Sequence, residues 1–124
     1  MSIQRIDSNN RMSQLVVYNG IAYLAGQVDE TSVIGRPAGE QTVNILKQID
    51  AYLAKAGTDK TKLLTTTIYL ADIADFAAMN AAWEAWVSPQ GLPTRATVEA
   101  KLAGPEYTVE IVVTAAIQSL ESTV

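Results

Sequence analysis

The chain opens with a pattern typical of β-strands. Ile3 to Ile6 fits a short first strand, and two runs rich in β-branched and aromatic residues, Gln14 to Tyr18 and Ile21 to Gln27, predict two more. The Asn-Gly pair between these two runs tolerates positive φ at both central positions of a type I′ turn, so we expect them to form a hairpin. Glycines and a proline then predict a loop over residues 28–39.

Two stretches farther along the chain have the period of a helix. The first begins at Glu40, and Gly57 stands just past its expected end. The second begins with Asp72 or Asp75 as its cap and ends at a segment rich in proline and glycine. The apolar stripes are Val43, Leu46, Ile49 and Leu53 in the first helix, and Phe76, Met79, Trp83 and Trp86 or Val87 in the second.

Three further strands complete the pattern, over Leu63 to Ala71, Thr94 to Leu102 and Tyr107 to Ile117. The element order predicts an α+β fold in which two helices can cover only one face of the sheet. In the last two strands we expect the helix-packed face to consist of Ala96, Val98, Ala100, Leu102, Val109, Ile111, Val113 and Ala115. The other face suits open solvent or a semi-polar subunit interface and favours an oligomer, because it carries Tyr69, Arg95, Thr97, Glu99, Lys101, Thr108, Glu110, Val112 and Thr114.

Composition narrows the possible chemistry. The chain has 124 residues, of which 48% are hydrophobic and 18% charged, so we expect a globular protein with one domain over residues 1–124. It contains no cysteine and no histidine. Disulfides, thiolate or imidazole metal sites and a Ser-His-Asp triad are therefore excluded. Catalysis would have to use carboxylates, arginine, lysine, tyrosine, hydroxyls, backbone groups and water.

The charge balance speaks against nucleic acid as a partner. The net charge is -4, the sequence pI is about 4.6, and lysines and arginines form no cluster. No window approaches the ~18 consecutive apolar residues of a membrane span, and the first residues lack the apolar region of a signal peptide. We therefore expect a cytoplasmic protein with neither a nucleic-acid nor a membrane partner.

One motif connects the fifth and sixth predicted strands. A Pro-x-Arg-x-x-Val-x strand, with Pro93 and Arg95, is followed fifteen residues after the arginine by Glu110 in an apolar strand. This arrangement resembles the closing signature of the Rid family, also called YjgF or endoribonuclease L-PSP. Further matches are AGQ at residues 25–27, QIDAYLAKAG at 48–57 and FAAMNAAWEAW at 76–86. The opening IQRID and the run ADFAAMNAAWEAWV look closest to the YoaB-like branch, often called Rid2.

The resemblance implies a chorismate-mutase-like mixed β-sheet with two helices packed on one face, assembled as a homotrimer with clefts at the subunit interfaces. RidA-family members that carry the arginine hydrolyse reactive enamines and imines, such as 2-aminoacrylate, to 2-keto acids and ammonia. We therefore expect an enamine/imine deaminase, a hydrolase that needs no cofactor and no metal. The implied catalytic residues are Arg95 and Glu110, and the implied substrate-binding residues are Arg95, Gly26, Asn80, Thr97 and Met12.

The residue types suit that chemistry. An imino acid carries a planar carboxylate, and the guanidinium of Arg95 offers a bidentate fork of fixed charge that matches it. Hydrolysis also needs a water held against the C=N carbon, and the carboxylate of Glu110 could orient or deprotonate that water. Gly26 has no Cβ, so its backbone could approach the ligand closely.

Simpler interpretations remain open for the same residues. Arg95 could be a surface residue that pairs with Glu99 or Glu110, and Glu110 could be half of a structural ion pair. Asn80 could face solvent. Trp83 and Trp86 are most simply packing residues, and the run of three threonines at residues 65–67 is most simply a result of β-propensity.

The sequence departs from the best-known deaminases of the family at three positions. Met12 stands where those proteins have a tyrosine, Ala25 where they have a serine, and Thr97 where they have a cysteine. The lost hydroxyls put substrate range and rate in doubt, so a second hypothesis is a trimeric module that binds small carboxylates such as 2-keto acids without catalysis. RNA cleavage or translation inhibition is a weak third hypothesis. Arg11, beside Met12, could enter the cleft or remain a solvated loop residue.

Overall fold

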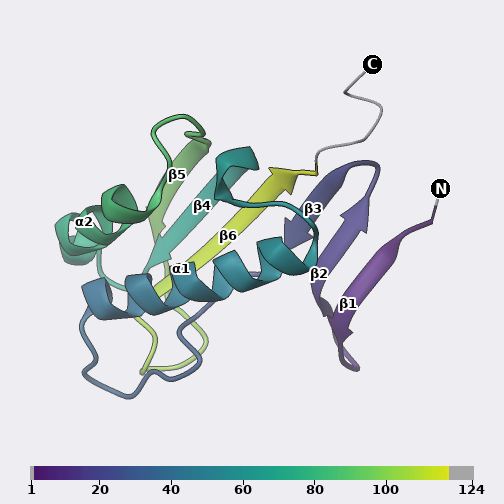
Figure 1. The fold of residues 1–124 in the computed structure, drawn as a ribbon. Helices are drawn as coiled ribbons and strands as arrows, with labels where there is room; N and C mark the ends of the chain where they lie inside the picture. Colours follow the sequence, from purple (N-terminus) through teal and green to yellow (C-terminus); the bar gives the residue numbers. More distant parts are fainter. Residues whose placement is uncertain (1, 118–124) are drawn as a thin grey trace.

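The computed structural model describes residues 2–117. Six strands form one sheet in the order β1-β2-β3-β6-β4-β5, and two α-helices accompany it (Figure 1). The strands are β1 (Gln4–Ser8), β2 (Ser13–Tyr18), β3 (Ile21–Leu24), β4 (Leu63–Leu70), β5 (Thr94–Glu99) and β6 (Val109–Ala116). The helices are α1 (Ala38–Lys55) and α2 (Phe76–Trp86), with short 3-10 turns η1 (Lys60–Lys62) and η2 (Ile73–Asp75).

Local sequence signals account for the first half of the sheet. Asn19 and Gly20 have positive φ values of 53° and 77°, and β2 and β3 pair antiparallel around them, so the predicted hairpin is confirmed. The third strand ends at Leu24, earlier than expected, although Gln27 still forms an isolated bridge to Ile111.

The second half depends on long-range pairing. β4 lies between the last two strands, parallel to β5 and antiparallel to β6. β4, α2 and β5 therefore form a crossover unit in which the helix connects two parallel strands. The two last strands therefore do not form a hairpin with each other.

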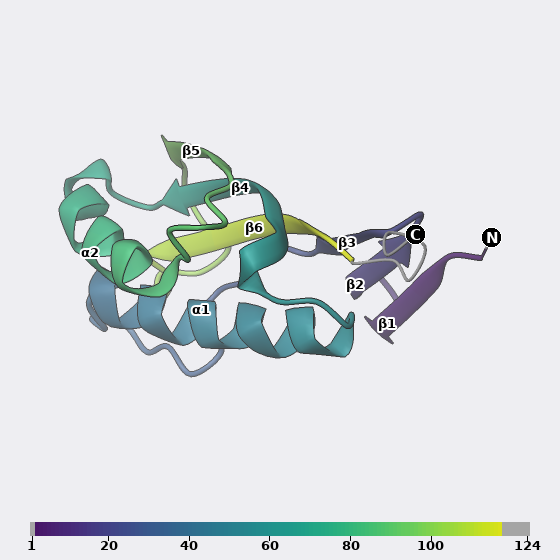
Figure 2. The same ribbon diagram turned by 45° about the horizontal axis from the view of Figure 1, so that its top comes forward.

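Both helices lie on the same side of the sheet, as Figure 2 shows, so the predicted α+β fold with one covered face is confirmed. The buried face of α1 consists of Ala38, Gln41, Thr42, Ile45, Leu46, Ile49 and Leu53. Val43, which was expected in this stripe, is exposed because the buried stripe is displaced around the helix toward Thr42 and Ile45. None of the helices within residues 2–117 is both long enough and apolar enough to cross a membrane.

The predicted faces are right for β6 and wrong for β5. On β6, the residues buried beneath the helices are the expected ones: Val109, Ile111, Val113 and Ala115. On β5, Arg95 and Thr97 lie in register with Thr66 and Ile68, which are buried on the helix side. The residues expected to pack on the helices face the other way at Ala96 and Val98, and lie past the end of the strand at Ala100 and Leu102.

The physical reason is that β5 is an edge strand. Alternation of apolar and polar residues identifies the inner face only where one face is buried and the other solvated. Most of β5 is exposed on both faces, so its small and apolar residues are not driven toward the helices. Its parallel register with β4 decides instead which side chains point to the helix layer.

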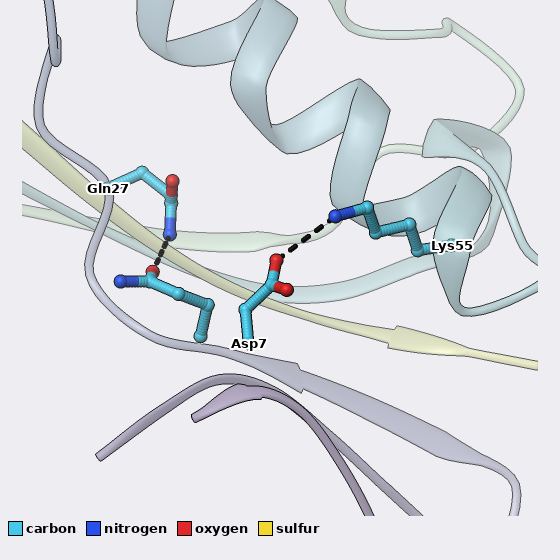
Figure 3. Close-up of polar contacts among 4 residues, drawn as sticks. Asp7, Gln27 and Lys55 are labelled. Atoms are coloured by element: carbon cyan, nitrogen blue, oxygen red, sulfur yellow. Dashed lines mark hydrogen bonds and ion pairs between the residues drawn. The ribbon is translucent and has the colours of Figure 1, made fainter. Parts of the chain in front are cut away.

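A single ion pair among the described residues connects the opposite edge of the sheet to the helix layer. Lys55 at the end of α1 lies 3.0 Å from the carboxylate of Asp7 in β1 (Figure 3). The hydrogen bond from Lys55 lowers the pKa of Asp7. Because both side chains are about half exposed, this pair contributes little to stability.

Candidate functional site

Arg95 lies on the helix side of the sheet. Its guanidinium carbon Cζ is 5.8 Å from the ring centroid of Phe76 and 5.8 Å from that of Trp83, both in α2. Within residues 2–117 no carboxylate lies within ion-pair distance of this guanidinium. Glu99 instead accepts a 2.9 Å hydrogen bond from the backbone N–H that begins η2. Neither Glu99 nor Glu110 therefore pairs with Arg95 in the same chain.

Further polar groups are gathered near Arg95. Asn80 stands four residues after Phe76 and three before Trp83, so helical geometry places it on the same face of α2 as the two rings. Thr97 shares the face of β5 that carries Arg95. The hydroxyls of Thr97 and of Thr66 are buried and have no hydrogen-bond partner among the described residues.

Unpartnered buried hydroxyls are uncommon in native structures. Two of them occur beside Arg95: Thr66 lies in register with Arg95 on β4, and Thr97 stands two residues after it on β5. The sequence did not single out Thr66, because a threonine in a strand is ordinarily explained by β-propensity. Only the strand register, which places Thr66 next to Arg95, makes it a candidate site residue.

Glu110 lies on the other face of the sheet. In the pairing of β6 with β4 it stands opposite Tyr69 of β4. Its side chain lies against Gly26, in the segment that follows β3. A Cβ atom at Gly26 would lie 2.9 Å from Cδ of Glu110 and closer still to its Oε2. The carboxylate thus occupies the space beside Gly26 that a Cβ atom would fill.

A shallow hollow adjoins this carboxylate. It has a volume of about 300 Å³ and is lined by Glu110, Tyr69, Val112 and the segment 100–103, which includes Lys101. An acid, a phenol and an amine therefore surround a concavity on the face of the sheet that the helices leave open. The size suits a ligand of a few heavy atoms.

Hydrogen bonds of glutamine side chains hold the segment that carries Gly26 in place. The backbone of Gln27 exchanges hydrogen bonds of 2.8 and 3.0 Å with Ile111 of β6. Its side-chain amide donates to the carbonyl oxygen of Gln14 at 2.9 Å (Figure 3), and Gln48 of α1 donates to the Val28 carbonyl at 2.8 Å. These backbone and side-chain hydrogen bonds fix the segment that carries Gly26 against both β6 and α1. Gln14 was not predicted to have this role.

Met12 lies far from Arg95. It follows a turn in which Asn9 Oδ1 accepts hydrogen bonds from the backbone N–H groups of Arg11 and Met12, at 2.8 and 3.0 Å. The turn leads into β2, which is separated from β5 by β3, β6 and β4. At the usual strand spacing that is a distance of roughly 19 Å. Met12 contacts instead the side chain of Gln14, which belongs to the Gly26 side of the site.

Asp29 stabilises the loop that leads from Gly26 to α1. Its carboxylate is fully buried and accepts hydrogen bonds from Asn44 Nδ2 at 2.9 Å, from the Thr31 backbone at 2.9 Å and from the Thr31 hydroxyl at 2.7 Å. Burial by itself would raise the pKa of Asp29, but the hydrogen bonds from Asn44 and Thr31 outweigh it and lower the pKa. The charged form is therefore the form that the loop requires.

The structure thus brings the expected residues together as two groups. Arg95, Thr97 and Asn80 belong to the helix side of the sheet. Gly26 and Glu110 belong to its open face. In one copy of the chain the sheet itself separates the cation from the carboxylate.

Comparison with known proteins identifies the family of this chain. A family model described as endoribonuclease L-PSP matches residues 2–117. A RutC family protein of Haemophilus ducreyi is 53% identical over 117 residues, covering 93% of this chain and 97% of the relative. The RutC family protein YoaB of Escherichia coli is 47% identical over 117 residues, covering 94% and 100%. The crystal structure of a YjgF family member from Neisseria meningitidis superimposes with a TM-score of 0.91 at 44% identity, covering 96% and 98%.

The fold and the matches first define a class: α+β proteins with a mixed six-stranded sheet and both helices on one face, as in solved YjgF proteins. Within that class, the chain belongs to the endoribonuclease L-PSP family, whose members here also bear the names RutC and YjgF. The family resemblance inferred from the Arg95 and Glu110 signature is confirmed, including the similarity to YoaB.

Proposed function

We propose that this protein is a cofactor-independent deaminase that hydrolyses 2-imino acids, and enamines such as 2-aminoacrylate after their tautomerisation to the imine, to 2-keto acids and ammonia. The observation that carries the proposal is the guanidinium of Arg95, which faces no carboxylate within residues 2–117. A positive charge of this kind is suited to an anionic ligand.

Arg95 would bind the substrate carboxylate. The guanidinium presents parallel N–H donors that match the two oxygens of a carboxylate, and its charge does not depend on pH in the physiological range. Binding in this geometry would orient the planar imino acid and leave its C=N carbon open to attack by water.

Glu110 would handle the protons. As water attacks the imine carbon, its carboxylate would accept one proton, and a C–O bond would form while the C=N bond becomes a C–N single bond. That proton would pass to the imine nitrogen, which gives the tetrahedral carbinolamine. The carboxylate would then carry the hydroxyl proton of the carbinolamine to the nitrogen, as the C–N bond breaks and the C=O bond forms. The products are one 2-keto acid and one ammonia for each imine and each water.

The separation of the two groups suggests that the site lies between copies of the chain. The open face around Glu110 also carries large exposed side chains, among them Tyr23 and Val98. Exposed apolar groups of this kind favour an interface. We therefore propose a homotrimer in which Arg95 of one copy faces the Glu110 and Gly26 of a neighbouring copy across an interface cleft.

A second candidate function is a binding module for 2-keto acids without catalysis. It is favoured by Ala25 and Met12, which offer no hydroxyl next to the segment that carries Gly26. Such a protein would bind the carboxylate through Arg95 but would not accelerate the loss of an imine.

A coupled assay separates these functions. An amino acid oxidase or a serine/threonine dehydratase generates the imine in situ, semicarbazide traps what remains, and depletion is followed with wild type, Arg95→Ala and Arg95→Lys. We expect wild type to deplete the imine faster than buffer and Arg95→Ala to lose about 100-fold or more in kcat/KM, because two charge-assisted hydrogen bonds are removed. Arg95→Lys should recover only part of that loss.

Arg5→Ala is the matched control, since it removes the same charge from an exposed position in β1 at the other edge of the sheet. Its rate should equal that of wild type. Circular dichroism should show that all variants fold. If wild type does not exceed buffer with small, branched or aromatic imines but still binds pyruvate, the deaminase proposal is wrong and the binding module replaces it.

A further inference from the structure

The contact between Arg95 and α2 goes beyond simple packing. Phe76 and Trp83 stand seven residues apart, which is about two turns, so their rings lie on the same face of the helix. Both ring centroids are 5.8 Å from the guanidinium carbon, within the distance at which a ring attracts a cation. We call these two rings the aromatic shelf.

The shelf contacts the guanidinium in a way that leaves its donors available. A guanidinium can stack on an aromatic ring while the N–H groups at its edge donate hydrogen bonds. Residues 2–117 supply no carboxylate within ion-pair distance of Arg95. The arginine therefore lies against the two rings while its donors remain available to an oxoanion.

Trp83 is itself firmly placed. Only 6% of it is exposed, and its ring lies 5.5 Å from that of Trp86 at an interplanar angle of 50°. Trp86 in turn donates from Nε1 to the carboxylate of Asp50 in α1, at 2.9 Å. A chain of contacts thus runs from α1 through the two tryptophans to Arg95, while Phe76, 41% exposed, completes the shelf at the surface.

We propose that Phe76 and Trp83 are positioning residues that hold the guanidinium of Arg95 in the orientation that receives a substrate carboxylate. This inference rests on the proposed role of Arg95. A free arginine side chain samples many rotamers, and part of that entropy is lost when it binds a ligand. An arginine already ordered by the shelf loses less, so ligands bind more tightly.

Phe76→Leu tests the proposal without disturbing the core, because Phe76 is partly exposed and leucine keeps an apolar side chain there. Two readouts are needed. The first is the Nε–Hε signal of Arg95 in a nitrogen–proton NMR spectrum of the free protein, which the ring currents of the shelf shift. The second is the affinity for pyruvate, measured by titration.

We expect Phe76→Leu to move the Arg95 Hε signal and to weaken pyruvate binding about two- to five-fold, the range of an exposed cation–π contact. In the deaminase assay KM should rise by a similar factor while kcat stays within two-fold. Phe76→Tyr keeps a ring and should restore both readouts. Trp83→Phe should behave as Phe76→Tyr does, and Trp83→Leu as Phe76→Leu does.

Tyr18→Leu is the matched control. Tyr18 is also 41% exposed and loses a ring in the same way, but it lies in β2, separated from β5 by three strands. It should leave the Arg95 signal and pyruvate affinity unchanged.

The outcomes distinguish the two proposals. An Arg95 Hε signal that does not move in Phe76→Leu overturns the shelf, whatever the activity is. A signal that moves while pyruvate affinity stays at the wild-type value overturns the positioning role. Wild-type protein that neither binds pyruvate nor depletes the imine overturns the proposed function and, with it, the role of the shelf.

Discussion

The two faces of the sheet differ in how they hold their charged groups. On the helix side, Arg95 rests on aromatic rings and faces no anion within residues 2–117. On the open face, Glu110 rests on a glycine backbone beside a hollow of about 300 Å³. The cation is supported by side chains of a helix, the carboxylate by backbone that adjoins a network of glutamines.

The difference teaches that one chain carries the proposed anchor and the proposed base on opposite faces of the sheet. Both groups can be reached by a ligand or another chain, because Arg95 is exposed and Glu110 is only partly buried. In the proposed homotrimer, Arg95 of one copy lies across the interface cleft from Glu110 of a neighbouring copy.

The largest effect is expected from mixing two inactive variants. Arg95→Ala and Glu110→Gln should each be inactive alone in the coupled assay. After joint unfolding and refolding at equal amounts, about a quarter of the sites should hold both native residues, because each residue is drawn independently from a different copy. Activity near that fraction of wild type would support the interface site.

Two controls complete the mixing experiment. Each variant refolded by itself should remain inactive. The double variant refolded with wild type should also recover about a quarter of the wild-type activity if the two residues come from different copies. Recovery of half the activity there, with none in the first mixture, would place both residues in one copy and contradict the model.

Gly26→Ala should separate the two faces kinetically. The added Cβ would lie 2.9 Å from Cδ of Glu110 and would displace its carboxylate. We expect kcat to fall about 10- to 100-fold, since a misplaced base loses part of its contribution, while pyruvate affinity changes far less. Gly39→Ala is the control, because the nearest atom to a Cβ at that position is 3.7 Å away. A Gly26→Ala variant with normal kcat would show that the position of Glu110 is irrelevant.

The loop between the two layers should respond to pH through Asp29. Its pKa is lowered in the folded state, so its contribution is present above the unfolded value of 3.8 and is lost as the pH falls below it. At neutral pH, Asp29→Asn should reduce the free energy of unfolding by about 2 kcal/mol, because the new amide places a donor against Asn44. Urea unfolding at pH 7 and at pH 3 should show this difference shrinking at the lower pH.

Asp59→Asn provides the matched control. Asp59 accepts hydrogen bonds from the backbone and hydroxyl of Thr61, as Asp29 does from Thr31, but it is exposed. Its substitution should change the urea midpoint much less. Equal effects at the two aspartates would mean that burial of Asp29 is unimportant.

Several elements of this protein follow from short-range patterns. The Asn-Gly pair predicts the β2–β3 hairpin because few other residues adopt two consecutive positive φ values. The alternation in β6 predicts its inner face correctly, since β6 lies between two strands with one face covered by helices. The same reasoning fails for β5, where exposure on both faces removes the driving force that alternation reports.

The site divides in the same way. The family signature proposed Arg95, Glu110 and Gly26 as site residues, and the chemistry of these residue types suits that proposal. The opposite orientation of Arg95 and Glu110 could not be predicted, since it depends on a parallel register between β5 and β4 that no local signal encodes. The same holds for Thr66 and for the aromatic shelf.

The sequence by itself therefore determined the element types and the family of this protein, and it supplied the candidate reactive groups. Those features depend on local conformational preference and on the chemistry of single side chains. Tertiary structure alone decided which face of the sheet each reactive group occupies and what supports it, because pairing between distant strands sets the direction of every side chain along them.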